Sequence, residues 1–177
     1  MEAQEIISKR RSIRSYEPDK IEDTVIKEIL HDASLAPSAH NKQPWEFVVI
    51  QNTFLKNKIA DFLTEKDIQM GRISSSSETA RVIKEAPVCI LVYNKYDVEP
   101  MMQTLSVGAC IQNMLLSATN HGLGSLWVGN VLKVETEINQ LLGKNGHLMS
   151  AVLLGYVHTY PSMPDRNMVD AITEWKI

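Results

Sequence analysis

Hydrophobic residues in this chain recur either at helical spacing or in short continuous runs. Ile21 begins a series in which apolar residues return every fourth position, which predicts a helix that runs to about Leu35 and ends before Pro37. Apolar runs bounded by turn residues predict strands at 47–50, 88–93, 125–128 and 150–156. The run at 88–93 is apolar at every position and is therefore expected in the middle of a sheet covered on both faces.

Further helical patterns occupy the intervals between these strands. Residues 54–62 have apolar positions on one face, and a helix is predicted to begin near Pro100 and to end at His121-Gly122 with glycine as a left-handed cap. That helix has almost no polar side, so we expect it to lie against core all around or against another subunit. A further helix closes on Gly143. Strands separated by helices predict an α+β or α/β sandwich.

The segment 71–77 has no apolar periodicity and contains four consecutive serines. It is interpreted either as a surface linker or as a mobile flap over a substrate pocket. The chain shows no internal repeat, and 177 residues with 44% hydrophobic composition are enough for one substantial core. We expect a single domain over residues 1–177.

Composition and charge argue against several classes of function. The formal net charge is −3, from 18 basic and 21 acidic residues. The chain therefore has no overall positive potential that would attract nucleic acid or anionic lipid. The N-terminus lacks the features of a signal peptide, and the most apolar long stretch, 105–118, is too short and too polar to span a membrane. Cys89 and Cys110 form no metal motif with the scattered histidines, so two buried free thiols, no metal and a cytoplasmic location are expected.

Three arginines and a serine stand together in Arg10-Arg11-Ser12-Ile13-Arg14. Arginine presents a planar fork of donors that matches phosphate oxygens two at a time, so the cluster is a candidate anion site. A solvated basic surface is the alternative interpretation. A second polar segment, 36–47, carries two prolines together with Ser38, Asn41 and Gln43 and leads into the first strand. It is interpreted as a fixed binding loop or as a turn that caps the preceding helix.

Together these two segments strongly resemble the nitroreductase family of FMN-dependent oxidoreductases. Two further stretches agree with the resemblance: Gly108–Leu116, which continues to His121–Gly129 and is similar to the family's central helix and following turn, and Leu153–Asn167, which is similar to its closing strand and basic tail. The resemblance covers essentially the whole chain. It implies a nitroreductase-like α+β sandwich, with a central, mostly antiparallel sheet flanked by helices, in a dimeric protein.

The resemblance also implies roles for particular residues. Arg10 and Ser12 would bind the FMN phosphate or ribityl chain, with Arg166 completing the clamp, while Arg14 would lie at the flavin pyrimidine edge, where a cation stabilises the negative charge of reduced flavin. Arg11 would share the phosphate or face water. The implied contacts from the second subunit are Pro37, Ser38, Asn41 and Gln43, and those beside the flavin ring are Trp127, Val128 and Gly129. Trp127 could equally be an ordinary core residue.

The chain departs from the family pattern at two positions. Pro164 stands where many relatives carry a lysine, which leaves one phosphate cation missing or supplied by Arg11. Ser106 stands where relatives often have an acidic residue at the start of the central helix, which puts details of capping or of the interface in doubt.

The sequence therefore predicts a homodimeric oxidoreductase with an FMN site at each subunit interface and no assigned catalytic side chain. NAD(P)H would reduce the flavin, and a small electron acceptor such as a nitroaromatic or quinone would reoxidise it in a ping-pong cycle. The chain contains neither a G-x-S-x-G nucleophile motif nor a G-x-G-x-x-G dinucleotide motif. The alternatives are a reductive dehalogenase or a flavin-fragmenting enzyme on the same scaffold, a non-catalytic flavin-binding protein and an anion-binding structural domain.

Overall fold

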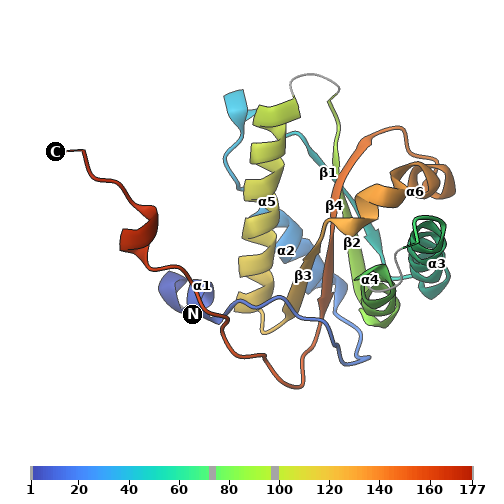
Figure 1. Ribbon diagram of the computed structural model, residues 1–177, viewed down its shortest axis with the longest axis horizontal. Coiled ribbons are helices and arrows are strands. Elements are labelled where there is room, and N and C mark those ends of the chain that lie inside the picture. Colours follow the sequence, from blue (N-terminus) through green and yellow to red (C-terminus); the bar gives the residue numbers. More distant parts are fainter. Residues whose placement is uncertain (1, 72–74, 97–99, 177) are drawn as a thin grey trace.

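The computed structural model describes residues 2–71, 75–96 and 100–176. Within them, an antiparallel sheet lies between two layers of helices (Figure 1). The strands are β1 (Trp45–Ile50), β2 (Val88–Asn94), β3 (Gly124–Val128) and β4 (His147–Gly155), in the spatial order β1-β2-β4-β3. Every neighbouring pair of strands is antiparallel. The α+β class predicted from the sequence is confirmed.

The helices divide between the two faces of the sheet. The α-helices are α1 (Ala3–Lys9), α2 (Asp23–Ser34), α3 (Thr53–Gln69), α4 (Ser75–Glu85), α5 (Pro100–Asn120) and α6 (Glu135–Leu142). Short 3-10 turns are η1 (Ala39–Asn41), η2 (Asn130–Val134) and η3 (Val169–Ile172). Helices α2 and α5 cover one face, and α3, α4 and α6 cover the other (Figure 1).

Strand β2 shows why the sheet is buried on both sides. Successive side chains of a strand point to opposite faces. Val88, Ile90 and Val92 join the core beneath α2 and α5, whereas Cys89, Leu91 and Tyr93 join the core beneath α3, α4 and α6. All seven residues of β2 are buried, as the uninterrupted apolar run predicted.

The serine-rich segment differs from its expected form. Ser75–Ser77 form the first turn of α4, so the expectation of a linker or flap through residue 77 is wrong for this part, and 72–74 lie outside the described residues. The apolar positions that hold α4 to the core come later in the helix, at Ala80, Val82 and Ile83. Serine is favoured at helix starts, so a run without apolar periodicity is compatible with a first turn.

Helix α5 is buried along most of its length but not at its start. Met101 is 78% exposed and Leu105 is 70% exposed, so this helix does not lie against core all around. Packing against another subunit stays a prediction. At the other end, Gly122 has φ 74° and supplies the predicted left-handed turn. Within the described residues, no helix is both long and apolar enough to cross a bilayer.

Candidate functional site

The segment that follows α1 is attached to the sheet beside β3. Ser12 forms a parallel bridge with Ser125, and the main-chain N–H of Ile13 donates to the carbonyl of Ser125 at 2.9 Å. The Ile13 side chain is only 2% exposed. Because side chains of an extended segment alternate in direction, its neighbours Ser12 and Arg14 point outward, and both are exposed. Burial of Ile13 therefore turns the side chains of Ser12 and Arg14 outward, where a ligand can reach them.

Two glycines allow this segment to approach the sheet closely. A Cβ atom at Gly124 would lie 2.2 Å from Cγ2 of Val157 and 2.8 Å from Cγ1 of Ile13. A Cβ atom at Gly155 would lie 2.6 Å from Cδ1 of Tyr16. Such distances are shorter than packed carbon atoms tolerate, so side chains at these positions would displace the segment.

A cavity of about 410 Å³ opens between the two ends of the chain. The N-terminal segment contributes all four of its predicted polar residues, and the C-terminal segment contributes Arg166 together with two prolines and a serine. The lining residues are Arg10, Arg11, Ser12, Arg14, Pro161, Ser162, Pro164 and Arg166. The structure thus brings together residues that are separated by some 150 positions in the sequence. That they bind a phosphate stays a prediction.

The electrostatics of the cavity favour an anion. Burial lowers the pKa of Arg10, and the positive charges of Arg166 and Arg11 lower it further. Arginine nevertheless remains protonated at neutral pH. None of the residues that line the cavity is acidic, so an anionic ligand would relieve the repulsion between these cations.

Arg11 is more constrained than its neighbours. Its Nη1 donates to the carbonyl oxygens of Ser8 and Arg10, each at 2.7 Å. Its Nε is buried and has no hydrogen-bond partner among the described residues. Pro164, which replaces the lysine of many relatives, lies in the cavity wall and brings no charge. Arg11 therefore lies where it could supply that missing cation.

The second predicted segment forms a tight loop around η1. The Oγ of Ser38 accepts from the main-chain N–H of Gln43 at 2.9 Å, and the Gln43 side-chain amide donates to Oδ1 of Asn41 at 3.2 Å. His40, Asn41 and Gln43 have positive φ angles of 53°, 53° and 46°. Non-glycine residues in this region are strained and need support from their surroundings. The Ser38 hydroxyl therefore stabilises its own loop, and binding of a ligand by this loop stays a prediction.

Ser106 supplies part of that support. Its hydroxyl donates to the carbonyl of Met102 at 2.8 Å and accepts from the N–H of Ala39 at 3.3 Å. The departure from an acidic residue at this position therefore has a local role, because the hydroxyl joins the loop to α5.

Within one protomer, this loop and the segment after α1 that lines the arginine cavity lie at opposite ends of α5 (Figure 1). The loop contacts the helix at Ser106, whereas Arg11 lies near its other end, in a second cavity lined also by Thr119 and Gly122. The 13 positions from 106 to 119 correspond to about 20 Å at the helical rise. A single protomer therefore does not bring the two predicted halves of the site together.

The residues at the end of β3 adopt distinct environments. Trp127 is 44% exposed, so the alternative that it is a core residue is wrong. Val128 is buried, so its side chain is not available to a ligand, and its carbonyl already accepts from the Ser150 hydroxyl at 2.9 Å. A Cβ atom at Gly129 would have no heavy atom of another described residue within 4 Å, its two chain neighbours aside, so the space beside this main chain is open.

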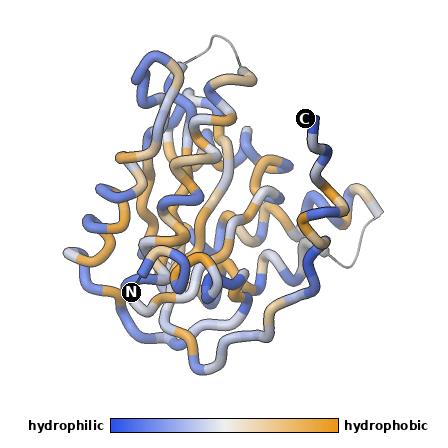
Figure 2. Tube along the Cα trace, turned by 90° about the vertical axis from the view of Figure 1, so that its left-hand side faces the viewer, coloured by the Kyte–Doolittle hydropathy of each residue, from blue (hydrophilic) through white to orange (hydrophobic). Residues whose placement is uncertain are grey.

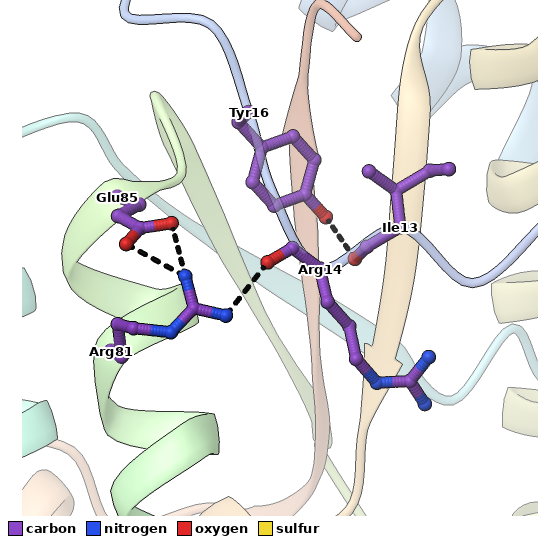
Figure 3. Close-up of polar contacts among 5 residues, drawn as sticks. All are labelled: Ile13, Arg14, Tyr16, Arg81 and Glu85. Atoms are coloured by element: carbon purple, nitrogen blue, oxygen red, sulfur yellow. Dashed lines mark hydrogen bonds and ion pairs between the residues drawn. The ribbon is translucent and has the colours of Figure 1, made fainter. Parts of the chain in front are cut away.

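Arg14 is held by residues that sequence reasoning missed. Nη2 of Arg81, on α4, donates to the main-chain carbonyl of Arg14 at 3.1 Å, and the Tyr16 hydroxyl donates to the carbonyl of Ile13 at 3.0 Å (Figure 3). Burial raises the pKa of Tyr16, which keeps its hydroxyl protonated and able to donate. In the sequence, Arg81 and Glu85 form an ordinary helix-surface pair four residues apart, with no signal of a link to residue 14.

The sequence model of the Nitroreductase family matches residues 7–156. The chain belongs to the nitroreductase family. All four strands, the segment 10–14 and the loop around η1 fall within the matched residues, whereas the cavity residues between 161 and 166 lie beyond them. As a member, it is an oxidoreductase.

Individual relatives are similar along most of the chain. One is a protein of Archaeoglobus fulgidus named NADH dehydrogenase/NAD(P)H nitroreductase, a name that is itself marked as provisional. It is 35% identical over 159 residues, which cover 88% of this chain and 85% of that protein. Iodotyrosine deiodinase 1 of Rattus norvegicus is 30% identical over 192 residues, covering 95% and 67% respectively. The structure of a BluB-like flavoprotein from Clostridium difficile 630 has a TM-score of 0.85, 28% identity and 99% coverage of both chains.

Proposed function

We propose that this protein is a homodimeric FMN-dependent oxidoreductase that takes hydride from NAD(P)H and delivers electrons to a small acceptor such as a nitroaromatic or a quinone. The observation that carries the proposal is the cavity where Arg10, Arg11, Arg14 and Arg166 converge without an acidic residue in its lining. The phosphate of FMN is a small dianion, and arginine guanidinium groups bind phosphate oxygens through paired, charge-assisted hydrogen bonds. The donor set therefore fits the phosphate end of this cofactor.

The cavity assigns a role to each of its polar residues. Arg10, Ser12 and Arg166 would hold the phosphate, and Arg11 would add a cation where Pro164 offers none. Ser12 is well placed for this role, because its main chain is fixed to β3 at Ser125. Arg14 points outward two positions later and would lie at the pyrimidine edge of the flavin, where a positive charge favours the reduced state.

The arrangement around α5 supports a dimer. The loop with Asn41 and Gln43 lies too far from the arginines of its own protomer, but a second copy related by a two-fold axis would bring its loop to them. The first turns of α5 expose Met101 and Leu105. The C-terminal segment projects from the body of the protein (Figure 1), and its trace includes hydrophobic residues (Figure 2). Its large apolar residues are exposed by at least 68% each: Met168, Val169, Ile172 and Trp175. Exposed apolar residues at two places on the surface are consistent with protein–protein contacts.

Bound FMN would supply the hydride-accepting chemistry, while the protein supplies position and charge. The main chain at Val128 and Gly129 would border the flavin ring, and the open space beside Gly129 permits that approach. No side chain is assigned as a proton donor, and the acceptor would take its proton from water. A ping-pong cycle follows if donor and acceptor occupy the same space in turn.

The visible spectrum of the protein loaded with FMN tests the proposal directly. Anaerobic NADH or NADPH should bleach the flavin band, and a nitroaromatic or quinone should restore it. Failure to retain FMN would overturn the proposal. Bound flavin that neither nicotinamide bleaches would favour a non-catalytic flavin-binding protein.

A reductive dehalogenase is the second candidate, favoured by the 30% identity to iodotyrosine deiodinase 1. Chemically reduced, FMN-loaded protein should then be reoxidised by iodotyrosine with release of iodide. Reoxidation by nitroaromatics alone would exclude this candidate.

A further inference from the structure

We propose that Arg81 is a positioning residue for Arg14: by holding the main-chain carbonyl of Arg14, it aims that side chain at the flavin and so helps to set the relative affinity for reduced and oxidised FMN. The inference rests on the proposed function, because it takes Arg14 to face the pyrimidine edge. Arg81 itself lies outside the lining of the cavity.

The hydrogen bonds of Arg81 fix its direction. Its Nη1 donates to both carboxylate oxygens of Glu85, at 2.7 and 2.6 Å, and its Nη2 donates to the carbonyl of Arg14 at 3.1 Å (Figure 3). The helix that carries both residues is anchored by Val82 and Ile83, which are 1% and 0% exposed. The guanidinium group therefore extends from a fixed support.

The two peptide units that flank the Cα atom of Arg14 are both restrained. The carbonyl of Ile13 belongs to the preceding unit and accepts from Tyr16, while the carbonyl of Arg14 belongs to the following unit and accepts from Arg81. Fixing both units fixes φ and ψ at residue 14, and these angles set the direction of the Cα–Cβ bond. Tyr16 belongs to the N-terminal segment itself, whereas Arg81 holds the second peptide unit from α4.

The side chain of Arg14 has little restraint of its own. Its Nη1 makes a 3.3 Å bond to the carbonyl of Ser12, and its guanidinium points away from the Arg81–Glu85 pair (Figure 3). Its direction therefore depends on its main chain. Glu85 offsets the charge of Arg81, so Arg81 acts on Arg14 mainly as a hydrogen-bond donor. The ion pair alone contributes little, because its side chains are 49% and 39% exposed.

The test compares the dissociation constants of oxidised and reduced FMN in the wild-type protein and in Arg81→Met. Loss of one hydrogen bond to Arg14 should weaken the binding of reduced FMN more than that of oxidised FMN, so that their ratio shifts about two- to tenfold. The midpoint potential should become more negative accordingly. Lys84→Met is the matched control, because Lys84 lies on the same helix and forms a comparable ion pair with Asp61 at 2.8 Å. It should leave the ratio unchanged.

A double-mutant cycle with Arg14→Met separates positioning from a direct effect of the Arg81 charge. If Arg81 acts through Arg14, R81M should no longer change the ratio of the two FMN dissociation constants when Arg14 is already replaced by methionine. A shift of equal size in both backgrounds, or an unchanged ratio in R81M, would overturn the inference. Arg81→Lys keeps a donor and should restore part of the wild-type ratio.

Three further outcomes have distinct meanings. If R81M does not fold, Glu85→Gln, which loosens Arg81 without removing it, enters the same cycle and should shift the ratio in the same direction by a smaller factor. If the wild-type protein fails to bind FMN, the proposed function fails. If it binds and reduces FMN normally but R81M and E85Q match it, only the role of Arg81 fails.

Discussion

Gly124 and Ile13 are packed so closely that a Cβ atom at position 124 would lie 2.8 Å from Cγ1 of the isoleucine. The contact joins β3 to the segment that presents Ser12 and Arg14. Gly124→Ala should therefore destabilise the protein by about 1–3 kcal/mol through overpacking and weaken FMN binding as Ile13 moves. Thermal unfolding and flavin titration measure the two effects. Gly146→Ala is the control, because its nearest contact would be an ordinary 3.4 Å. Equal losses in both variants would contradict the proposed packing.

The arginine cavity predicts discrimination between FMN and riboflavin, which lacks the phosphate. Arg10→Met or Arg166→Met should reduce FMN affinity about tenfold or more, because each removes a charge-assisted hydrogen bond. Riboflavin affinity should change little. Fluorescence titration with both flavins measures this, and Lys20→Met, at an exposed position, serves as the control. Parallel losses for both flavins would show that these arginines do not bind the phosphate.

Separation of the two site halves along α5 predicts complementation between subunits. Arg10→Met/Arg14→Met and Asn41→Ala/Gln43→Ala homodimers should each bind FMN poorly. Co-refolding the two variants yields heterodimers in which one site has both defects and the other has neither. Up to half of the wild-type flavin stoichiometry per heterodimer should return. No recovery would contradict a site shared between subunits.

Both cysteines should resist thiol reagents in the folded protein. Cys89 and Cys110 are buried free thiols, as the sequence predicted, and burial raises the pKa of each to about 12. Because the thiolate is the reactive form, neither residue should react with an aromatic disulfide reagent at pH 8. Two thiols should titrate in guanidinium chloride. Rapid reaction without denaturant would show that these core regions open.

We expect the buried hydroxyl of Tyr16 to make the protein less stable at alkaline pH. An unfolded phenol ionises near pH 10, whereas burial raises the pKa of Tyr16 in the folded protein. At a pH between the pKa of the unfolded phenol and that of the folded one, the unfolded state has lost a proton that the folded state keeps. The contribution of Tyr16 to the free energy of unfolding is therefore complete below pH 10 and declines above it. Tyr16→Phe should flatten the fall in denaturation midpoint above pH 10. An identical pH profile in both proteins would contradict a buried, protonated hydroxyl.

The fold was predictable where side-chain burial repeats with a clear period. The apolar run of β2 and the four-residue step of α2 place their elements nearly at the observed bounds. Helix α1 was missed because it has seven residues and buries none of them. Helix α4 was missed as a whole, because it begins with a run of serines without periodicity and its apolar residues begin only at Ala80.

The candidate site was predictable where the sequence resembles its family and unpredictable where the geometry depends on tertiary contacts. The convergence of Arg10 and Arg166 followed from matching motifs at the two ends of the chain. The Arg81 bond to residue 14 spans 67 positions and ends on a main-chain oxygen, which no side-chain pattern reveals. The exposure of Trp127 likewise depends on how β3 meets α5.

The cavity is built from positions 10–14 and 161–166, two segments that lie far apart in the sequence and outside all four strands. The sheet can therefore form whether or not both segments are in place, but the arginines converge only when both are. A variant cut after residue 160 would keep every strand while losing Pro161, Ser162, Pro164 and Arg166 from the lining. Under the proposed function, such a variant would separate folding of the sheet from retention of the cofactor.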